Sequence, residues 1–186
     1  TEIAGLFIVM AVFAGLAGKM GLNEIAEEFV KGARDLTYGA LIVGVARAIL
    51  VVLTEGNIID TILFGMANAI SGLPSALNAL GMYVVQCLLN FIVPSGSGQA
   101  AVSMPIMAPL SDLVGVTRQT AVLAFQFGDG ISNILTPTSG YFMAGLALAK
   151  VPYHKWVKWV LPLLGLQYLL GAILVTIAHL IQLGPF

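Results

Sequence analysis

Residues 90–140 read NFIVPSGSGQAAVSMPIMAPLSDLVGVTRQTAVLAFQFGDGISNILTPTSG, and this stretch decides the fold. It contains two apolar segments, and each is interrupted by glycine, proline and small polar residues. The interruptions are PSGSGQ at residues 94–99 and GDGISNILTPTSG at residues 128–140. Glycine weakens a helix interior, and proline removes one of its hydrogen bonds. The stretch therefore predicts two places where an apolar helix ends or breaks.

The composition of the whole chain indicates that lipid surrounds it. Of its 186 residues, 59% are hydrophobic and 9% are charged, and the mean hydropathy is +0.97. A soluble domain is usually about a quarter charged, because its surface faces water. We therefore predict an all-α integral membrane protein in contact with a lipid bilayer. The net charge of −1 gives no indication of a nucleic-acid partner.

The first part of the chain predicts two membrane spans and two helices that lie along the membrane interface. Residues 3–18 are an apolar run, and residues 36–54 are a second run interrupted only by Arg47. Residues 23–35 and 57–71 combine charged or polar residues with apolar residues at helical spacing, which is typical of an interfacial amphipathic helix.

The third apolar region predicts a re-entrant helical hairpin over residues 74–113, with its tip at residues 94–99. The return arm, residues 100–111, would be about 18 Å long as a helix, whereas the hydrocarbon core is about 30 Å thick. Pro105 and Pro109 make this arm a poorer straight helix still. We therefore expect the tip to stop part-way across the membrane.

The fourth region predicts a discontinuous helix over residues 118–149. As one unbroken helix, residues 118–150 would be about 48 Å long, which is too long for a single crossing. The glycines and Pro137 of its centre favour a break. An interfacial segment at residues 150–158 and a last span at residues 159–180 complete the chain.

The basic residues predict the orientation in a cell inner or plasma membrane. With four crossings and one hairpin, Arg118 lies on one face and most of the other basic residues lie on the opposite face. The excess of Lys and Arg marks the cytoplasmic side. Both termini of this chain and the mouth of the hairpin are then expected on the outer side. The residues of the cytoplasmic face are Lys19, Lys31, Arg34, Lys150, Lys155 and Lys158.

The two interruptions predict a binding site, because a broken helix leaves backbone groups free at mid-membrane depth. Hydroxyl, amide and carbonyl oxygens of this kind suit a hard cation such as Na⁺ or a small polar solute. Substrate contacts are expected from Ser95, Gly96, Ser97, Gly98, Thr136, Pro137, Thr138, Ser139, Arg47 and Asn90. A Na⁺ site is expected from Ser97, Gly98, Asp129, Asn133 and Thr136. We expect no other cofactor.

Asp129 and Arg47 are the two charged residues predicted deep in the membrane, where an ionisable side chain usually has a function. Two interpretations are open. They form a structural ion pair, or they act directly, with Arg47 holding a substrate carboxylate and Asp129 holding an amine, a proton or Na⁺. A charge-reversal double variant that restores transport would support the pair.

Three other functions fit the sequence less well. A passive channel would favour a ring of like charges, which the sequence lacks, and a membrane scaffold without transport stays open as an alternative. An intramembrane serine protease would need a base beside Ser97, but His179 lies near the end of a different span. We therefore predict a protein that is not an enzyme.

Residues 90–140, together with EEFVKGARDLTYGALIVGVARAIL at residues 27–50, resemble the YfcC-type branch of the C4-dicarboxylate anaerobic carrier (DcuC-like) family, within the ion transporter superfamily. The resemblance implies a longer protein with two inverted repeats, each with a re-entrant hairpin and a discontinuous helix. This chain, residues 1–186, would be the second repeat and one transmembrane unit. The N-terminal repeat that holds the other half of the site would be missing from it.

Relatives in this family are typically homodimers with a scaffold and a moving transport part. The resemblance implies a scaffold at residues 1–72, a transport part at 73–149, and an interfacial segment and last span at 150–186. The expected function is that of half a secondary active transporter, working by symport or antiport. It would move a small organic anion or an amino acid, such as a dicarboxylate, coupled to Na⁺ or H⁺.

Overall fold

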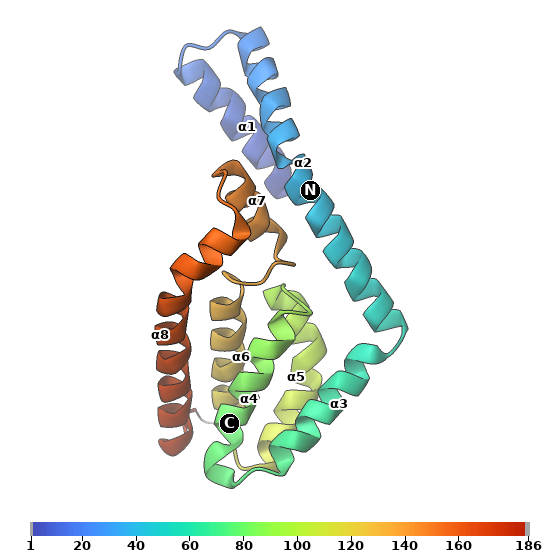
Figure 1. Ribbon diagram of the computed structural model, residues 1–186, viewed down its shortest axis with the longest axis vertical. Helices are drawn as coiled ribbons and strands as arrows, with labels where there is room; N and C mark the ends of the chain where they lie inside the picture. The colour runs from blue at the N-terminus through green and yellow to red at the C-terminus, as the bar shows by residue number, and fades with distance from the viewer. Residues whose placement is uncertain (1, 185–186) are drawn as a thin grey trace. The chain divides into compact units, whose positions relative to one another are not determined.

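The computed structural model describes the backbone of residues 2–184, and their side chains except for 2, 38–39, 42–43, 46–47, 50 and 75–76. All regular elements in this part of the chain are helices (Figure 1), which confirms the predicted all-α class. The chain divides into two compact units, Thr1–Tyr38 and Gly39–Phe186. The helices are α1 Glu2–Ala17, α2 Leu22–Glu55, α3 Ile58–Ser71, α4 Ser75–Asn90, α5 Gly96–Leu113, α6 Arg118–Ser132, α7 Gly140–Leu148 and α8 Tyr153–Leu180.

The first unit consists of α1 and the beginning of α2. Its apolar side chains are strongly exposed, with Ile3, Phe7 and Phe13 at 70%, 64% and 68%. Such surface is unfavourable in water and favourable in lipid. The two helices approach each other at Gly15, where an added Cβ would lie 2.7 Å from Cγ1 of Ile25.

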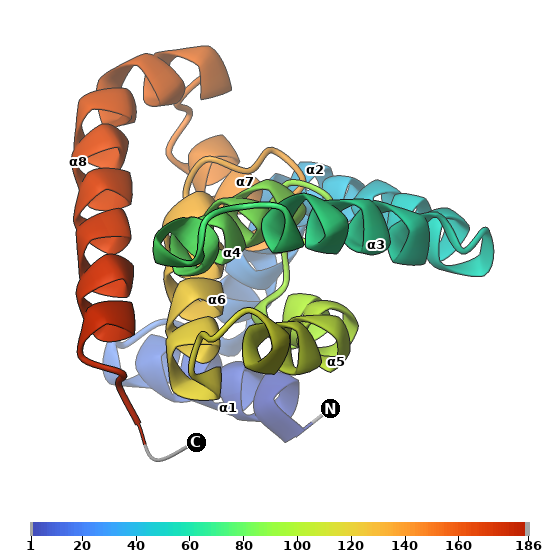
Figure 2. The same ribbon diagram turned by 90° about the horizontal axis from the view of Figure 1, so that it is seen from below.

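The second unit is built around α4 and α6. These two helices pack along each other, α6 also contacts α5 and α8, and α3 contacts α4 and α5 (Figure 2). Gly128 permits the close approach of α6 to α4, because an added Cβ would lie 2.9 Å from the backbone nitrogen of Cys87. The core between these helices is apolar and fully buried, with Leu63, Met82, Leu89, Met107, Ala124 and Val175 each at most 1% exposed.

The amphipathic helix predicted at residues 57–71 is present as α3. Its buried side chains, Ile59, Leu63, Ala67 and Ile70, recur every three or four residues and form one face. This face packs on α4 and α5. The position of α3 along a membrane interface stays a prediction.

The last helix, α8, has the dimensions of a membrane span. Its 28 residues extend about 42 Å, and among the described residues it is the one helix long and apolar enough to cross a bilayer. Pro162 lies inside it and removes one backbone hydrogen bond. Figures 1 and 2 show α8 bent in its N-terminal part.

Two predicted boundaries differ from the structure. The sequence predicts an interfacial helix at residues 23–35 and a separate span at 36–54, but α2 is a single helix over both. Its charged residues do not end it, since Glu, Lys and Arg are good helix formers, and Glu28 pairs with Lys31 one turn away. Likewise, Tyr153–Lys158 form the first turns of α8 and not a separate segment.

The membrane topology stays a prediction. It comprises the four crossings, the depth of the hairpin in the bilayer and the orientation. The division into a scaffold at 1–72 and a transport part at 73–149 also stays a prediction, and it is distinct from the two compact units.

Candidate functional site

The first interruption is a turn between α4 and α5. The chain leaves α4 after Asn90, and α5 begins at Gly96, so the non-helical residues are 91–95. The prediction that PSGSGQ is a non-helical tip is therefore wrong for Gly96–Gln99, which form the first turn of α5. The backbone N–H of Gln99 donates to the carbonyl of Ser95, which starts the helix. Because these residues belong to α5, the return arm has 18 helical residues and is about 27 Å long.

The second interruption lies between α6 and α7, inside the predicted discontinuous helix. α6 ends at Ser132 and α7 begins at Gly140, and residues 133–139 between them follow no regular helix. We call residues 133–139 the break. Within it Thr136 and Ser139 are fully buried, whereas Pro137 is exposed.

The turn and the break contact each other. The hydroxyl of Thr136 donates to Oδ1 of Asn90 at 2.9 Å, and the hydroxyl of Thr138 donates to the carbonyl of Phe91 at 3.2 Å. Segments about 45 residues apart in the sequence therefore meet at the ends of α4 and α6. This contact is the arrangement on which the predicted site depends.

Asp129 lies beside this contact. Its Oδ1 accepts hydrogen bonds from Nδ2 of Asn90 at 2.8 Å and from Nδ2 of Asn133 at 2.9 Å. Its Oδ2 faces the first turn of α5, since a Cβ added at Gly96 would lie 3.1 Å from it. A carboxylate is favoured at a helix N-terminus, where backbone N–H groups are unpaired. Within the described residues Asp129 forms no ion pair.

The predicted Arg47–Asp129 pair is not tested by the structure. The side chain of Arg47 lies outside the described residues. Both interpretations of Arg47, as a partner of Asp129 or as a substrate ligand, stay predictions.

A series of hydrogen bonds between buried side chains holds the side chain of Asn90 in place. Nδ2 of Asn90 also donates to Oε1 of Gln99 at 3.1 Å, and Nε2 of Gln99 donates to Oε1 of Gln86 at 2.8 Å. Gln86 in turn donates to the hydroxyl of Ser103 at 3.2 Å. All four side chains are at most 1% exposed. Because buried polar groups need hydrogen-bond partners, this series of hydrogen bonds fixes how α4 and α5 face each other.

Two buried polar atoms of the break have no partner among the described residues. They are Oδ1 of Asn133 and Oγ of Ser139. An unsatisfied buried polar atom costs about 1–3 kcal/mol. Such atoms are suited to bind a ligand, Asn133 through an acceptor oxygen and Ser139 through a hydroxyl that donates or accepts.

The structure brings only part of the predicted residue set together. Asn90, Asp129, Asn133 and Thr136 form one hydrogen-bonded cluster. Ser95 and Ser97 are exposed and form no side-chain hydrogen bond with the described residues. Their hydroxyls are thus separate from the cluster, although Gly96 and Gly98 lie in the same turn of α5.

The sequence interpretation missed several residues that shape the site. Gln86 and Ser103 were passed over, although a glutamine inside an apolar run is itself a signal of a buried hydrogen bond. Tyr168, whose hydroxyl donates to Oγ of Ser132 at 3.0 Å, carried no such signal. Tyr153 and Trp156 donate to carbonyls of the break, at Leu135 and Ile134.

The donor set fits a cation with oxygen ligands better than a transition metal. Within residues 2–184 no group of three or more His, Cys, Asp or Glu side chains is placed to hold a metal ion. Asp129 and Asn133 supply carboxylate and amide oxygens, which are ligands for Na⁺. Na⁺ would here be a transported or coupling ion and not a resident cofactor.

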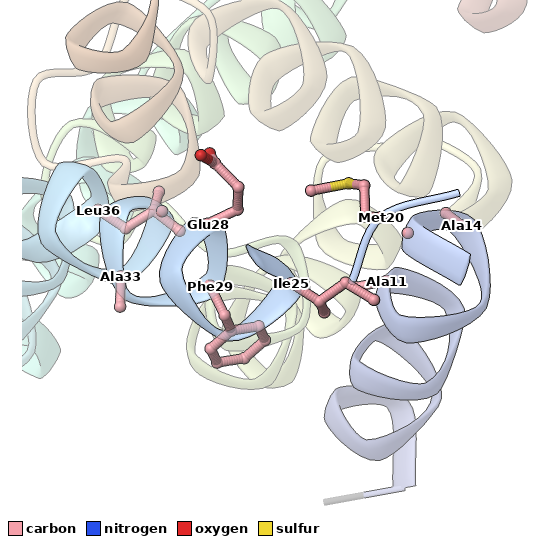
Figure 3. Close-up of a pocket in the computed structure, with 10 residues that line it drawn as sticks. Ala11, Ala14, Met20, Ile25, Glu28, Phe29, Ala33 and Leu36 are labelled. Carbon is pink, nitrogen blue, oxygen red and sulfur yellow. The ribbon is translucent and has the colours of Figure 1, made fainter. Parts of the chain in front are cut away.

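A large cavity of about 640 Å³ lies elsewhere, in the first unit between α1 and α2 (Figure 3). Ala11, Ala14, Ile25 and Phe29 are among the side chains that line it, and Glu28 is the charged residue of the lining. The cavity contains none of the predicted site residues. Its apolar lining is typical of a surface that lipid or another helix covers.

The amino-acid sequence is similar to that of a known family of membrane carriers. A family model described as "C4-dicarboxylate anaerobic carrier" matches residues 1–180. The chain is 45% identical to "Putative basic amino acid antiporter YfcC" of Escherichia coli (strain K12), over 96% of this chain and 38% of that protein. It is 39% identical to an uncharacterised protein of Haemophilus influenzae (strain ATCC 51907 / DSM 11121 / KW20 / Rd), over 95% of this chain and 34% of that protein. The chain thus spans a little over a third of the length of these curated relatives. No solved structure matches it.

Proposed function

Because the chain belongs to the C4-dicarboxylate anaerobic carrier family, we propose that it forms part of a secondary transporter for a small carboxylate-bearing metabolite. The observation that carries this proposal is the contact between the turn at residues 91–95 and the break at 133–139. Two helix interruptions that meet beside a carboxylate and two unpartnered polar atoms are typical of a transport site.

The solute's carboxylate would bind on the side of α7. The hydroxyl of Ser139 is unpartnered there, and it precedes the first turn of α7, whose backbone N–H groups carry partial positive charge. The first turn of α5 supplies similar groups at Gly96 and Gly98. Two helix N-termini on one site favour an anionic group.

Asp129 would hold the positive partner. For an amino-acid solute, this partner is the solute's own ammonium group. For a dicarboxylate, a coupling Na⁺ or proton takes this place, with Oδ1 of Asn133 as a further oxygen ligand. The family description names a dicarboxylate and the E. coli relative's name gives a basic amino acid, so both solutes belong in the test.

The transporter would contain more than this chain. We propose a preceding inverted repeat that supplies the opposite half of the site, and a homodimer as the assembly. In that arrangement residues 73–149 move the solute while the remaining helices hold the protein in the membrane.

Uptake into proteoliposomes tests the function. The complete protein that carries this chain is reconstituted, and uptake of labelled succinate and of labelled lysine is measured with and without gradients of Na⁺ and H⁺. We expect saturable uptake of one of them that stops when the driving gradient is dissipated. Unsaturable flux without a gradient would indicate a passive pore, and absence of uptake for every solute and gradient would contradict the proposal.

A further inference from the structure

The break leaves two consecutive backbone carbonyls outside the helical hydrogen-bond pattern. In a continuous helix, the carbonyls of Ile134 and Leu135 would accept from residues 138 and 139. The backbone N–H of Ser139 instead donates to the carbonyl of Thr136 at 3.0 Å. The two carbonyls immediately before Thr136 therefore need donors from elsewhere.

Both donors come from the first turn of α8. Nε1 of Trp156 donates to the carbonyl of Ile134 at 2.9 Å, and the hydroxyl of Tyr153 donates to the carbonyl of Leu135 at 2.7 Å. Residues three apart lie on the same face of a helix, which is why both side chains reach the break.

The same two rings also contact α7. The ring centroid of Phe142 lies 6.4 Å from that of Tyr153 and 5.8 Å from that of Trp156. We call Phe142, Tyr153 and Trp156 the aromatic clamp. It joins α7, the break and α8 through contacts that are separate from those of Asn90.

The clamp also changes the electrostatics of the break. Without these donors, the carbonyls of Ile134 and Leu135 would be unpaired within the break, and their partial negative charge would disfavour a carboxylate bound near it. Donation from an indole N–H and a phenol O–H offsets this charge. It also fixes the position of Thr136, Thr138 and Ser139, which follow directly.

We infer that Tyr153 and Trp156 are positioning residues of the transport site, which hold the break so that Thr136–Ser139 face the carboxylate of the solute. The inference rests on the proposed function for its transport consequences. The claim that Tyr153 and Trp156 fix the conformation of the break does not depend on the proposed function, since it concerns only their hydrogen bonds to the break.

Removal of single donor groups tests the transport consequence. Tyr153→Phe removes one hydroxyl and keeps the ring, and Trp156→Phe removes the indole N–H. We expect each variant to raise the KM for the solute about three- to tenfold, as expected for the loss of one hydrogen bond, with a maximal rate within about twofold of the parent. Loss of maximal rate with KM unchanged would overturn the inference, because it indicates a role only in folding.

The chain offers a matched control for the tyrosine. Tyr141 is 69% exposed, and its side chain forms no hydrogen bond with the described residues. Tyr141→Phe is expected to leave KM unchanged. Trp159 is not a control, because its ring centroid lies 5.4 Å from that of Trp156. An equal rise of KM in Tyr141→Phe would contradict a specific role of the clamp.

A labelling experiment separates the clamp from the function. In a Cys87→Ala background, Ser139→Cys places a thiol at a fully buried position of the break. We expect slow reaction with a maleimide, at least about fivefold faster when Tyr153→Phe is added and unchanged when Tyr141→Phe is added. Equal rates would overturn the inference whatever the transport result. A faster rate would leave the hold on the break established even if the complete protein with Ser139 unchanged transported nothing, and that second result would contradict the proposed function.

Discussion

At the scale of single residues, Asp129 is the charge on which coupling depends. It accepts from Asn90 and Asn133, so replacement by asparagine keeps one acceptor oxygen and the shape of the side chain. We expect Asp129→Asn to fold but to lose at least about tenfold of its ion-dependent uptake, because a neutral amide no longer balances a bound cation or carries a proton. Uptake measured against Na⁺ concentration and against pH checks this.

The same substitution has a readout without transport. The unfolding temperature of the protein in detergent is measured in NaCl and in choline chloride. If Na⁺ is the coupling ion, we expect the parent protein to unfold at a higher temperature in NaCl. Asp129→Asn is expected to abolish this difference. Asp60→Asn, at an exposed carboxylate of α3, serves as the control. Unchanged ion-dependent uptake in Asp129→Asn would show that the coupling ion binds elsewhere.

At the scale of elements, the approach of α4 to α6 positions the turn against the break. The two helices approach closely at Gly128, where an added Cβ would lie 2.7 Å from Cβ of Gln86 and 2.9 Å from the backbone nitrogen of Cys87. Gly128→Ala must therefore push the helices apart, and we expect it to lower the free energy of unfolding by about 1–3 kcal/mol. A thermal unfolding curve in detergent measures the loss.

Gly130 provides the control on the same helix. No atom lies within 4 Å of a Cβ added there. Gly130→Ala is expected to raise the stability by about 0.5–1 kcal/mol, because alanine is the better helix former. If Gly128→Ala were as stable as Gly130→Ala, close packing of α4 on α6 would not be what holds the two interruptions together.

At the scale of the whole molecule, the distribution of basic residues predicts which side of the membrane each end of the discontinuous helix faces. Leu113 precedes it and is 84% exposed, and Lys155 follows it and is also exposed. In a Cys87→Ala background, we expect a membrane-impermeant maleimide to label Leu113→Cys in intact cells. Labelling of Lys155→Cys is expected only after permeabilisation. Labelling of both from one side would contradict a crossing by residues 118–149.

Predictability from the sequence differs between the fold and the site. The helical class and the two interruptions follow from local properties, namely apolar runs cut by glycine and proline. The predicted start of the return arm at residue 100 was wrong, since α5 begins at Gly96. Glycine permits a helical first turn as well as a loop, and here the first turn faces the carboxylate of Asp129. The support of Asn90 by Gln86 and Ser103 was missed because the donor and acceptor belong to different helices.

By itself, the sequence indicated a lipid environment, the helical class and the approximate positions of the two helix interruptions within residues 90–140, since each depends on residues that are neighbours in the chain. It also predicted Asp129, Asn133 and Thr136 as members of one site. Only the tertiary structure decided that Asn90 links them and that Tyr153 and Trp156 hold the break. Hydrogen bonds between distant segments depend on how helices pack, and packing depends on the shapes of all the side chains at once.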